Sequence, residues 1–127
     1  MRDLETAKIM LRSAERDLLA LGHMLDQNAF PVEVFGFHAQ QVVEKSLKAW
    51  LSIKGAQFQR THNIRHLVAL LEPVESDVSN LWNLARLTGF AVQFRYEGFE
   101  MEDEELDRSS ILQMVRDLFV KVEKMMS

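Results

Sequence analysis

Apolar residues recur every three or four positions along most of the chain, which is the spacing of amphipathic helices. The pattern predicts helices over about 3–27, 31–54 and 64–72, a fourth from about 78, and a last one ending near 125. The first helix has the most regular apolar stripe: Leu4, Ala7, Leu11, Ala14, Leu18, Leu21 and Leu25. We therefore expect an all-α fold, an up-and-down helical bundle of four to five helices.

The second predicted helix, 31–54, has two unlike faces. Its apolar residues spread over more than half of the circumference, an arc too wide for one neighbouring helix to cover. They are Ala39, Val42, Val43, Leu47, Ala49, Trp50 and Leu51. This helix should therefore lie at the centre of the bundle. The remaining strip is polar and carries Phe37, His38, Gln41, Glu44, Lys45 and Lys48.

Residues that favour helix ends separate these segments. Pro31 suits the first turn of the second helix, and Gly55 ends that helix. Asn63 and Asp77 are expected to cap the third and fourth helices, and Pro73 ends the third. The buried positions expected in the later helices are Ile64, Leu67, Val68, Leu71, Val78, Leu81, Trp82, Ala85, Ile111, Val115, Leu118, Val122 and Met125.

Composition narrows the class of protein. The chain has 127 residues, which predicts one domain over 1–127 with a single core. It contains no cysteine and no apolar run near the ~18–20 residues of a membrane span, so we expect a cytoplasmic protein without a membrane partner. A net charge of −4 argues against a general nucleic-acid coat but leaves room for a local basic patch.

The polar strip of the second helix is the first candidate site. His38, Gln41 and Lys45 stand above one another at i, i+3 and i+7, with Lys48 beside them. Ammonium groups can bind a phosphate, and the amide and imidazole can donate hydrogen bonds to oxygens or base edges. The same residues could instead be a solvated helix face. Phe37 on this strip could stack on a base or be buried in a dimer contact.

Residues outside this helix offer further candidates. Arg95 can bind a phosphate and Tyr96 can stack, although both could simply hold a turn against the helix ends. His62 and His66 are four residues apart, but no carboxylate lies at a matching spacing, so we expect no metal site. The acidic run over 100–105 suits the start of the last helix. No cofactor-binding motif is found, and no cofactor is expected.

Three segments resemble, in order, the HEPN domain family (the higher eukaryote and prokaryote nucleotide-binding domain), in its minimal stand-alone prokaryotic type. FHAQQVVEKSLKAWL at 37–51 resembles the family's characteristic helix, and THNIRHLVALL at 61–71 resembles its His-led entry to a short helix. FRYEGF at 94–99 is similar to its Arg-Tyr turn, with Glu97 where proline is usual. The resemblance implies a bundle of the type found in nucleotidyltransferase substrate-binding subunits, commonly dimeric.

The resemblance implies different activities for different branches of the family. Some members bind nucleotides or act as the accessory half of a minimal nucleotidyltransferase pair. Others are metal-independent ribonuclease toxins that carry Arg, four to six residues, then His. After Arg95 the positions for that His are Glu100, Met101 and Glu102. We therefore assign no catalytic residue.

The sequence thus leads to one expected function and two alternatives. We expect a nucleotide-binding or accessory module that pairs with a minimal nucleotidyltransferase, in a toxin–antitoxin-like two-gene system, and forms a homodimer. The alternatives are a metal-independent endoribonuclease toxin acting on RNA and a purely structural dimerisation domain. The residues expected at the nucleotide site are His38, Gln41, Lys45, Lys48, His62, Arg95 and Tyr96.

Overall fold

The computed structural model describes residues 3–75, 78–88 and 107–126. These residues form helices and loops, with no strand among them. The helices are α1 (Leu4–Leu21), α2 (Val32–Ile53), α3 (Ile64–Leu71), the 3₁₀-helix η1 (Ser79–Leu87) and α5 (Arg108–Met125). The all-α fold is confirmed. No helix in these described segments is both long and apolar enough to cross a bilayer.

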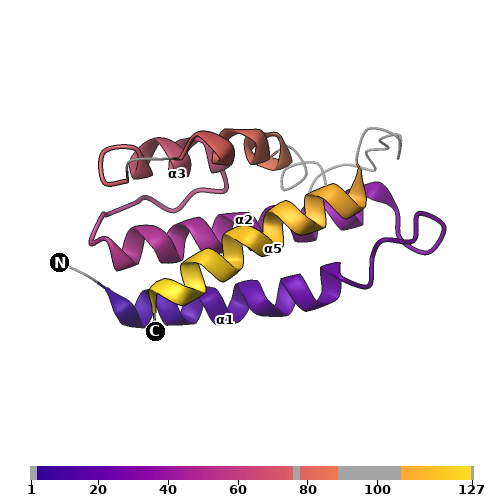
Figure 1. Ribbon diagram of the computed structural model, residues 1–127, viewed down its shortest axis with the longest axis horizontal. Coiled ribbons are helices and arrows are strands. Elements are labelled where there is room, and N and C mark those ends of the chain that lie inside the picture. The colour runs from indigo at the N-terminus through magenta and orange to yellow at the C-terminus, as the bar shows by residue number, and fades with distance from the viewer. Residues whose placement is uncertain (1–2, 76–77, 89–106, 127) are drawn as a thin grey trace.

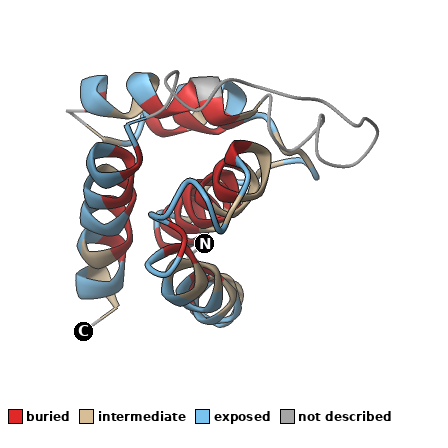
Figure 2. Cartoon of the chain, turned by 90° about the vertical axis from the view of Figure 1, so that its right-hand side faces the viewer, coloured by how far each residue is buried: buried red, intermediate tan, exposed pale blue. Residues whose placement is uncertain are grey.

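The helix α2 lies at the centre of the bundle, as its wide apolar arc predicted. It packs against α1, α3, η1 and α5. In Figure 1, α1 runs beside α2, α3 and η1 lie on the other side of α2, and α5 crosses obliquely over both long helices. The buried sides of the helices face the centre of this arrangement, and exposed residues lie on its outside (Figure 2). Trp50 and Leu47 are among the fully buried core residues of α2.

The helix α1 is shorter than its apolar stripe predicted. Its middle is buried as expected, but Leu4 is 44% and Leu25 is 40% exposed. The helix ends at Leu21, because Gly22 follows and the next N–H groups close tight turns onto Ala20 and Leu21 instead of continuing the helical ladder. Glycine is a poor helix former and favours the end of a helix. The predicted end at 27 was therefore wrong.

The other predicted ends mostly agree with the structure. Gly55 follows α2 with a φ of 77°, a left-handed conformation that glycine adopts without strain. The side chain of Asn63 accepts a 3.3 Å hydrogen bond from the backbone N–H of His66 and caps α3. Asp107 caps α5 in the same way, accepting from the N–H of Ser110 at 3.1 Å. The predicted cap Asp77 lies outside the described residues.

The fourth helix is a 3₁₀-helix, which changes the set of residues that it buries. A 3₁₀-helix repeats every three residues, and Val78, Leu84 and Leu87 are accordingly buried with Leu81 half-buried between them. Ala85 is also buried, as predicted. Trp82, which an α-helical period placed in the core, is only half-buried.

Two junctions fix the ends of the bundle. At the C-terminal end of α2, the Trp50 indole N–H donates to Glu75 Oε1 at 2.8 Å, and Lys54 Nζ lies 2.9 Å from the same oxygen. Lys121 of α5 lies 4.9 Å from the centre of the Trp50 ring. At the other end, the buried Arg108 donates to the carbonyl of Met24 at 2.8 Å. These contacts attach the last helix to both ends of the α1–α2 pair.

The central position of α2 leads to a stability prediction. Leu47 is 0% and Leu19 is 67% exposed. Leu47→Ala should lower the free energy of unfolding by about 2–5 kcal/mol, since it leaves a cavity in the core. The same change at Leu19 should cost less than ~0.5 kcal/mol. Urea unfolding of both variants measures the difference, and equal losses would contradict the placement of α2.

Candidate functional site

The polar strip of α2 is largely covered. Gln41, Glu44 and Lys48 are 9%, 4% and 7% exposed, whereas the side chains of His38 and Lys45 keep 27% and 22% of their surface. The alternative that this strip is simply a solvated helix face is therefore wrong for Gln41, Glu44 and Lys48.

A carboxylate on α1 holds the two more accessible residues of the strip. Asp17 Oδ1 lies 3.1 Å from His38 Nδ1, and Asp17 Oδ2 accepts a 2.6 Å hydrogen bond from Lys45 Nζ. The side chain of Asp17 is only 15% exposed. We call these three residues the Asp17 cluster. It joins α1 to α2 through charge as well as through apolar packing.

A second carboxylate, Glu44, holds the buried part of the strip. Its Oε2 accepts a 2.9 Å hydrogen bond from Lys48 Nζ. Its Oε1 accepts a 2.7 Å bond from Gln40 Nε2 and lies 3.0 Å from His62 Nδ1. Gln40 Nε2 also donates to the backbone carbonyl of His62 at 3.1 Å, and Gln41 Nε2 donates to Gln40 Oε1 at 2.7 Å. We call these five residues the Glu44 cluster.

The pKa of Glu44 reflects a balance between burial and hydrogen bonding. Burial alone raises the pKa of this carboxyl, because a charge is costly away from water. Hydrogen bonds from Lys48, Gln40 and His62 outweigh that effect and hold the pKa below its ordinary value of 4.5. Glu44 is therefore ionised at neutral pH, which keeps Lys48 paired.

The two clusters repeat one arrangement. In each, one carboxylate oxygen meets an imidazole Nδ1 and the other meets a lysine ammonium. Each lysine charge is thus neutralised by a carboxylate. An imidazole whose Nδ1 donates to a carboxylate has its tautomer fixed, with the lone pair on Nε2. His62, at 41% side-chain exposure, is the most accessible member of either cluster.

The structure divides the seven predicted site residues. His38 and Lys45 belong to the Asp17 cluster, whereas Gln41, Lys48 and His62 belong to the Glu44 cluster. The two lysines therefore bind different carboxylates. Arg95 and Tyr96 lie outside the described residues.

Three residues at these clusters were missed as site residues from the sequence. Asp17 shares an α1 row with the buried Ala14 and Leu21, and Gln40 shares an α2 row with Val43 and Leu47. A polar residue within an apolar helical row is a signal of a buried hydrogen-bonded group. The third, Glu44, was recognised only as an i, i+4 neighbour of Lys48.

The two histidines of the 61–71 segment separate in the structure. His62 turns to Glu44, whereas His66 is exposed beside Gln57 and Phe58. Within the described segments, His, Asp and Glu side chains nowhere gather in threes in a way that could hold a metal ion. Phe37 is half-buried and its ring meets that of His38 edge-on, with the ring centres 5.4 Å apart.

Comparison of the sequence with known proteins identifies a family and one partial relative. The family model of the HEPN domain matches residues 7–125. A protein of Methanocaldococcus jannaschii named "Putative toxin MJ1304" is 38% identical over 58 residues. The aligned segment covers 46% of this chain and 37% of that protein, so the chain spans little more than a third of the relative's length. No solved structure matches the chain.

The Glu44 cluster predicts a pH-dependent contribution to stability. Because the pKa of Glu44 is lowered from 4.5 by folding, its contribution is present above pH 4.5 and is lost as the pH falls through the lower folded value. Glu44→Gln should cost about 3 kcal/mol at neutral pH, since it leaves the Lys48 ammonium buried without a counter-charge. The difference between wild type and variant should shrink below pH 4.5.

Urea unfolding across this pH range measures the effect, with the double variant Glu44→Leu/Lys48→Met as control. Removing both charges should cost much less than removing one, because no unpaired ion remains. A single variant that is as stable as the wild type at neutral pH would contradict the pairing.

Proposed function

We propose, since the chain belongs to the HEPN family, that it is the HEPN component of a toxin–antitoxin-type two-gene system. In this proposal it is the nucleotide-binding accessory module of a minimal nucleotidyltransferase. The toxin assignment is supported by the partial relative whose name describes it as a putative toxin. A cytoplasmic location and a homodimeric state belong to the same proposal.

The observation that carries the nucleotide site is the repeated carboxylate–imidazole–ammonium arrangement along the polar strip of α2, to which α1 contributes Asp17 and the loop before α3 contributes His62. Exposure assigns different roles to its members. His62, His38 and Lys45 keep between 22% and 41% of their side-chain surface and would contact the ligand directly. Gln41 and Lys48 are buried and would act behind them by fixing Gln40 and Glu44.

The chemistry of these groups suits a nucleotide. Lysine has three N–H donors, so Lys45 can bind Asp17 with one and still offer donors to a phosphate oxygen. An imidazole Nε2 can accept a hydrogen bond from the exocyclic amine of a base. Because Asp17 and Glu44 already neutralise Lys45 and Lys48, recognition would depend on directed hydrogen bonds more than on net positive charge.

A nucleotide-binding test follows from the exposure of Lys45. Thermal unfolding of the wild type against a nucleotide panel should show a stabilising ligand, worth about 2.7 kcal/mol at ~100 times its dissociation constant. Lys45→Ala should abolish that shift, measured from the variant's own ligand-free midpoint. Lys8→Ala, which removes an exposed lysine on α1, should keep it. A panel with no stabilising nucleotide would count against this site.

The partner is tested separately from the ligand. Affinity purification of the tagged chain from its native host should recover a nucleotidyltransferase. A chain that always purifies alone would contradict the pairing, and a concentration-independent monomer mass in sedimentation would contradict the homodimer.

One observation favours the endoribonuclease as the second candidate. His62 is accessible and its Nδ1 is held by Glu44 at 3.0 Å, an arrangement that orients an imidazole as a general base. Such a base could remove the 2′-hydroxyl proton of RNA without a metal ion. Expression should then arrest growth, and cleavage of RNA in EDTA should fall ~10²–10⁴-fold in His62→Ala and be lost in Arg95→Ala. Inert behaviour of the wild type in both assays would remove this candidate.

A further inference from the structure

The loop between α2 and α3 carries a second group of side chains, separate from both carboxylate clusters. Residues 57–60 read Gln-Phe-Gln-Arg. A hollow of about 320 Å³ lies where this loop meets α3, lined by Gln57, Phe58, Gln59, His66 and Leu70. That volume lies at the lower end of the range of small-molecule sites, which is about 300–1,000 Å³.

Phe58 provides an anchored aromatic surface in this hollow. It is half-buried and packs against the core, so its side chain is already partly ordered. It also lines a second hollow, of about 430 Å³, together with Asp3, Thr6 and Ser52. Phe58 therefore borders both hollows. Aromatic side chains held in this way are platforms on which nucleic-acid bases stack.

The polar groups around Phe58 are available for a ligand. Gln57, Gln59 and His66 are exposed, and among the described residues their side chains have no hydrogen-bonding partner. A glutamine amide offers a donor and an acceptor together, which matches the edge of a purine base such as adenine. The hollow thus combines a stacking surface with groups that can read a base edge.

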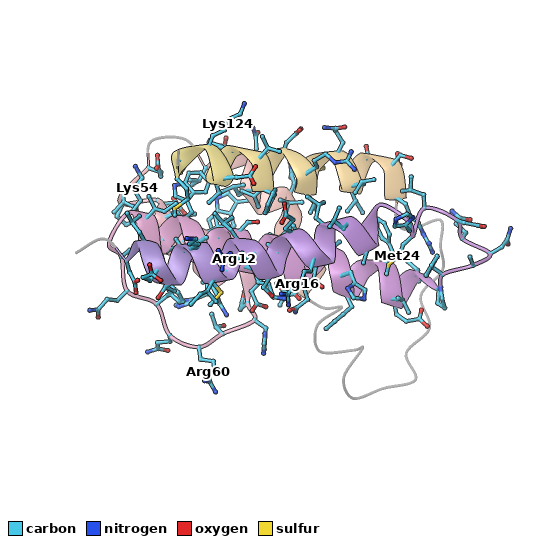
Figure 3. All side chains as sticks on the ribbon, turned by 90° about the horizontal axis from the view of Figure 1, so that it is seen from below. Arg12, Arg16, Met24, Lys54, Arg60 and Lys124 are labelled. Atoms are coloured by element: carbon cyan, nitrogen blue, oxygen red, sulfur yellow. The ribbon has the colours of Figure 1, made fainter. Side chains whose placement is uncertain are left out.

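Arg60 adds a cation to the same loop. Figure 3 shows its side chain projecting from the loop, away from the helices. Within the described parts of the chain it forms no ion pair, whereas Lys45, Lys48 and Lys54 each bind a carboxylate. A guanidinium without a counter-charge can bind phosphate bidentately. The second hollow carries Asp3 instead, which would repel an anion.

We propose that the hollow between residues 57–59 and α3 binds one nucleotide, with its base stacked on Phe58 and its phosphate on Arg60. Gln57 and Gln59 would contact the base edge. The same ligand chemistry occurs in a free mononucleotide and in one unit of a single-stranded RNA. The site shares no residue with the Asp17 and Glu44 clusters, so it does not depend on the nucleotide site proposed on α2.

The test measures binding of a fluorescent oligoadenylate by anisotropy, with AMP as the competing mononucleotide. Phe58→Leu keeps an apolar side chain against the core but removes the stacking face, and should weaken binding about 5- to 150-fold. Arg60→Gln should weaken binding and reduce the slope of log affinity against log salt by about 0.7, the value for one phosphate of a single strand. Arg12→Gln removes an exposed arginine of α1 (Figure 3) and should change neither the affinity nor its salt dependence.

Two further variants keep the test decisive. Gln57→Glu changes an exposed residue and should fold normally. Its added negative charge should weaken nucleotide binding, so this variant tests the site even if Phe58→Leu proves unstable. Lys45→Ala should leave this binding intact. Competition by AMP would identify a mononucleotide site, and binding of the oligomer alone would identify a strand site; either supports the proposal.

Several results would overturn the proposal. They are a wild type that binds neither ligand, equal weakening by Arg12→Gln and Arg60→Gln, and full affinity in the folded Phe58→Leu and Gln57→Glu variants. If Lys45→Ala abolishes binding while the variants of Gln57, Phe58 and Arg60 keep it, the nucleotide binds at α2 instead.

Discussion

The pairing of buried charges on α2 is the constraint on which the rest of the structure depends. Glu44 and Lys48 are 4% and 7% exposed, and moving such ions out of water costs several kcal/mol each unless they are paired and hydrogen-bonded. Lys48 pairs with Glu44 within α2 itself, whereas the hydrogen bonding of the other Glu44 oxygen requires the 55–63 loop to bring His62 over α2. The neighbouring Asp17 cluster makes a similar demand on α1. The positions of the elements beside α2 are thus tied to its polar strip as well as to its apolar arc.

The sequence predicted the helical framework well because helix periodicity and capping are local properties. The broad apolar arc of α2 required several neighbours, and the structure supplies them. Errors arose where apolar spacing was given more weight than other signals: Gly22 ended α1 although the apolar stripe continues to Leu25, and the period of three in η1 left Trp82 half-buried. The site was less predictable, because residue spacing on α2 shows which side chains share a face but not which groups approach from elsewhere. The apolar row around Asp17 signals a buried polar group, but the partners of Asp17 and the turn of His62 toward Glu44 are set by tertiary packing.

Exposure and neutralisation together change how the polar residues of this HEPN chain should be interpreted. Lys45 and Lys48, which the sequence offered as phosphate ligands, are engaged by carboxylates. Arg60, in the 55–63 loop, has no ion-pair partner among the described residues. Charged residues in a helix signature can therefore be structural, while the less patterned loop beside them carries accessible chemistry. This agrees with the general tendency of loops to carry binding residues on a rigid scaffold.

The junction at Trp50 has a consequence for following the assembly of the bundle. Trp50 is 1% exposed and contacts Glu75 and, on α5, Lys121. The other tryptophan, Trp82, is half-buried with the Arg65 guanidinium 5.8 Å from its ring centre. The two indoles therefore report different events by intrinsic fluorescence: one senses the docking of the C-terminal helix onto α2, and the other senses the surface between α3 and η1. Two variants, one keeping only Trp50 and the other only Trp82, would distinguish the docking of α5 onto α2 from the packing of α3 against η1 during folding, without any attached dye.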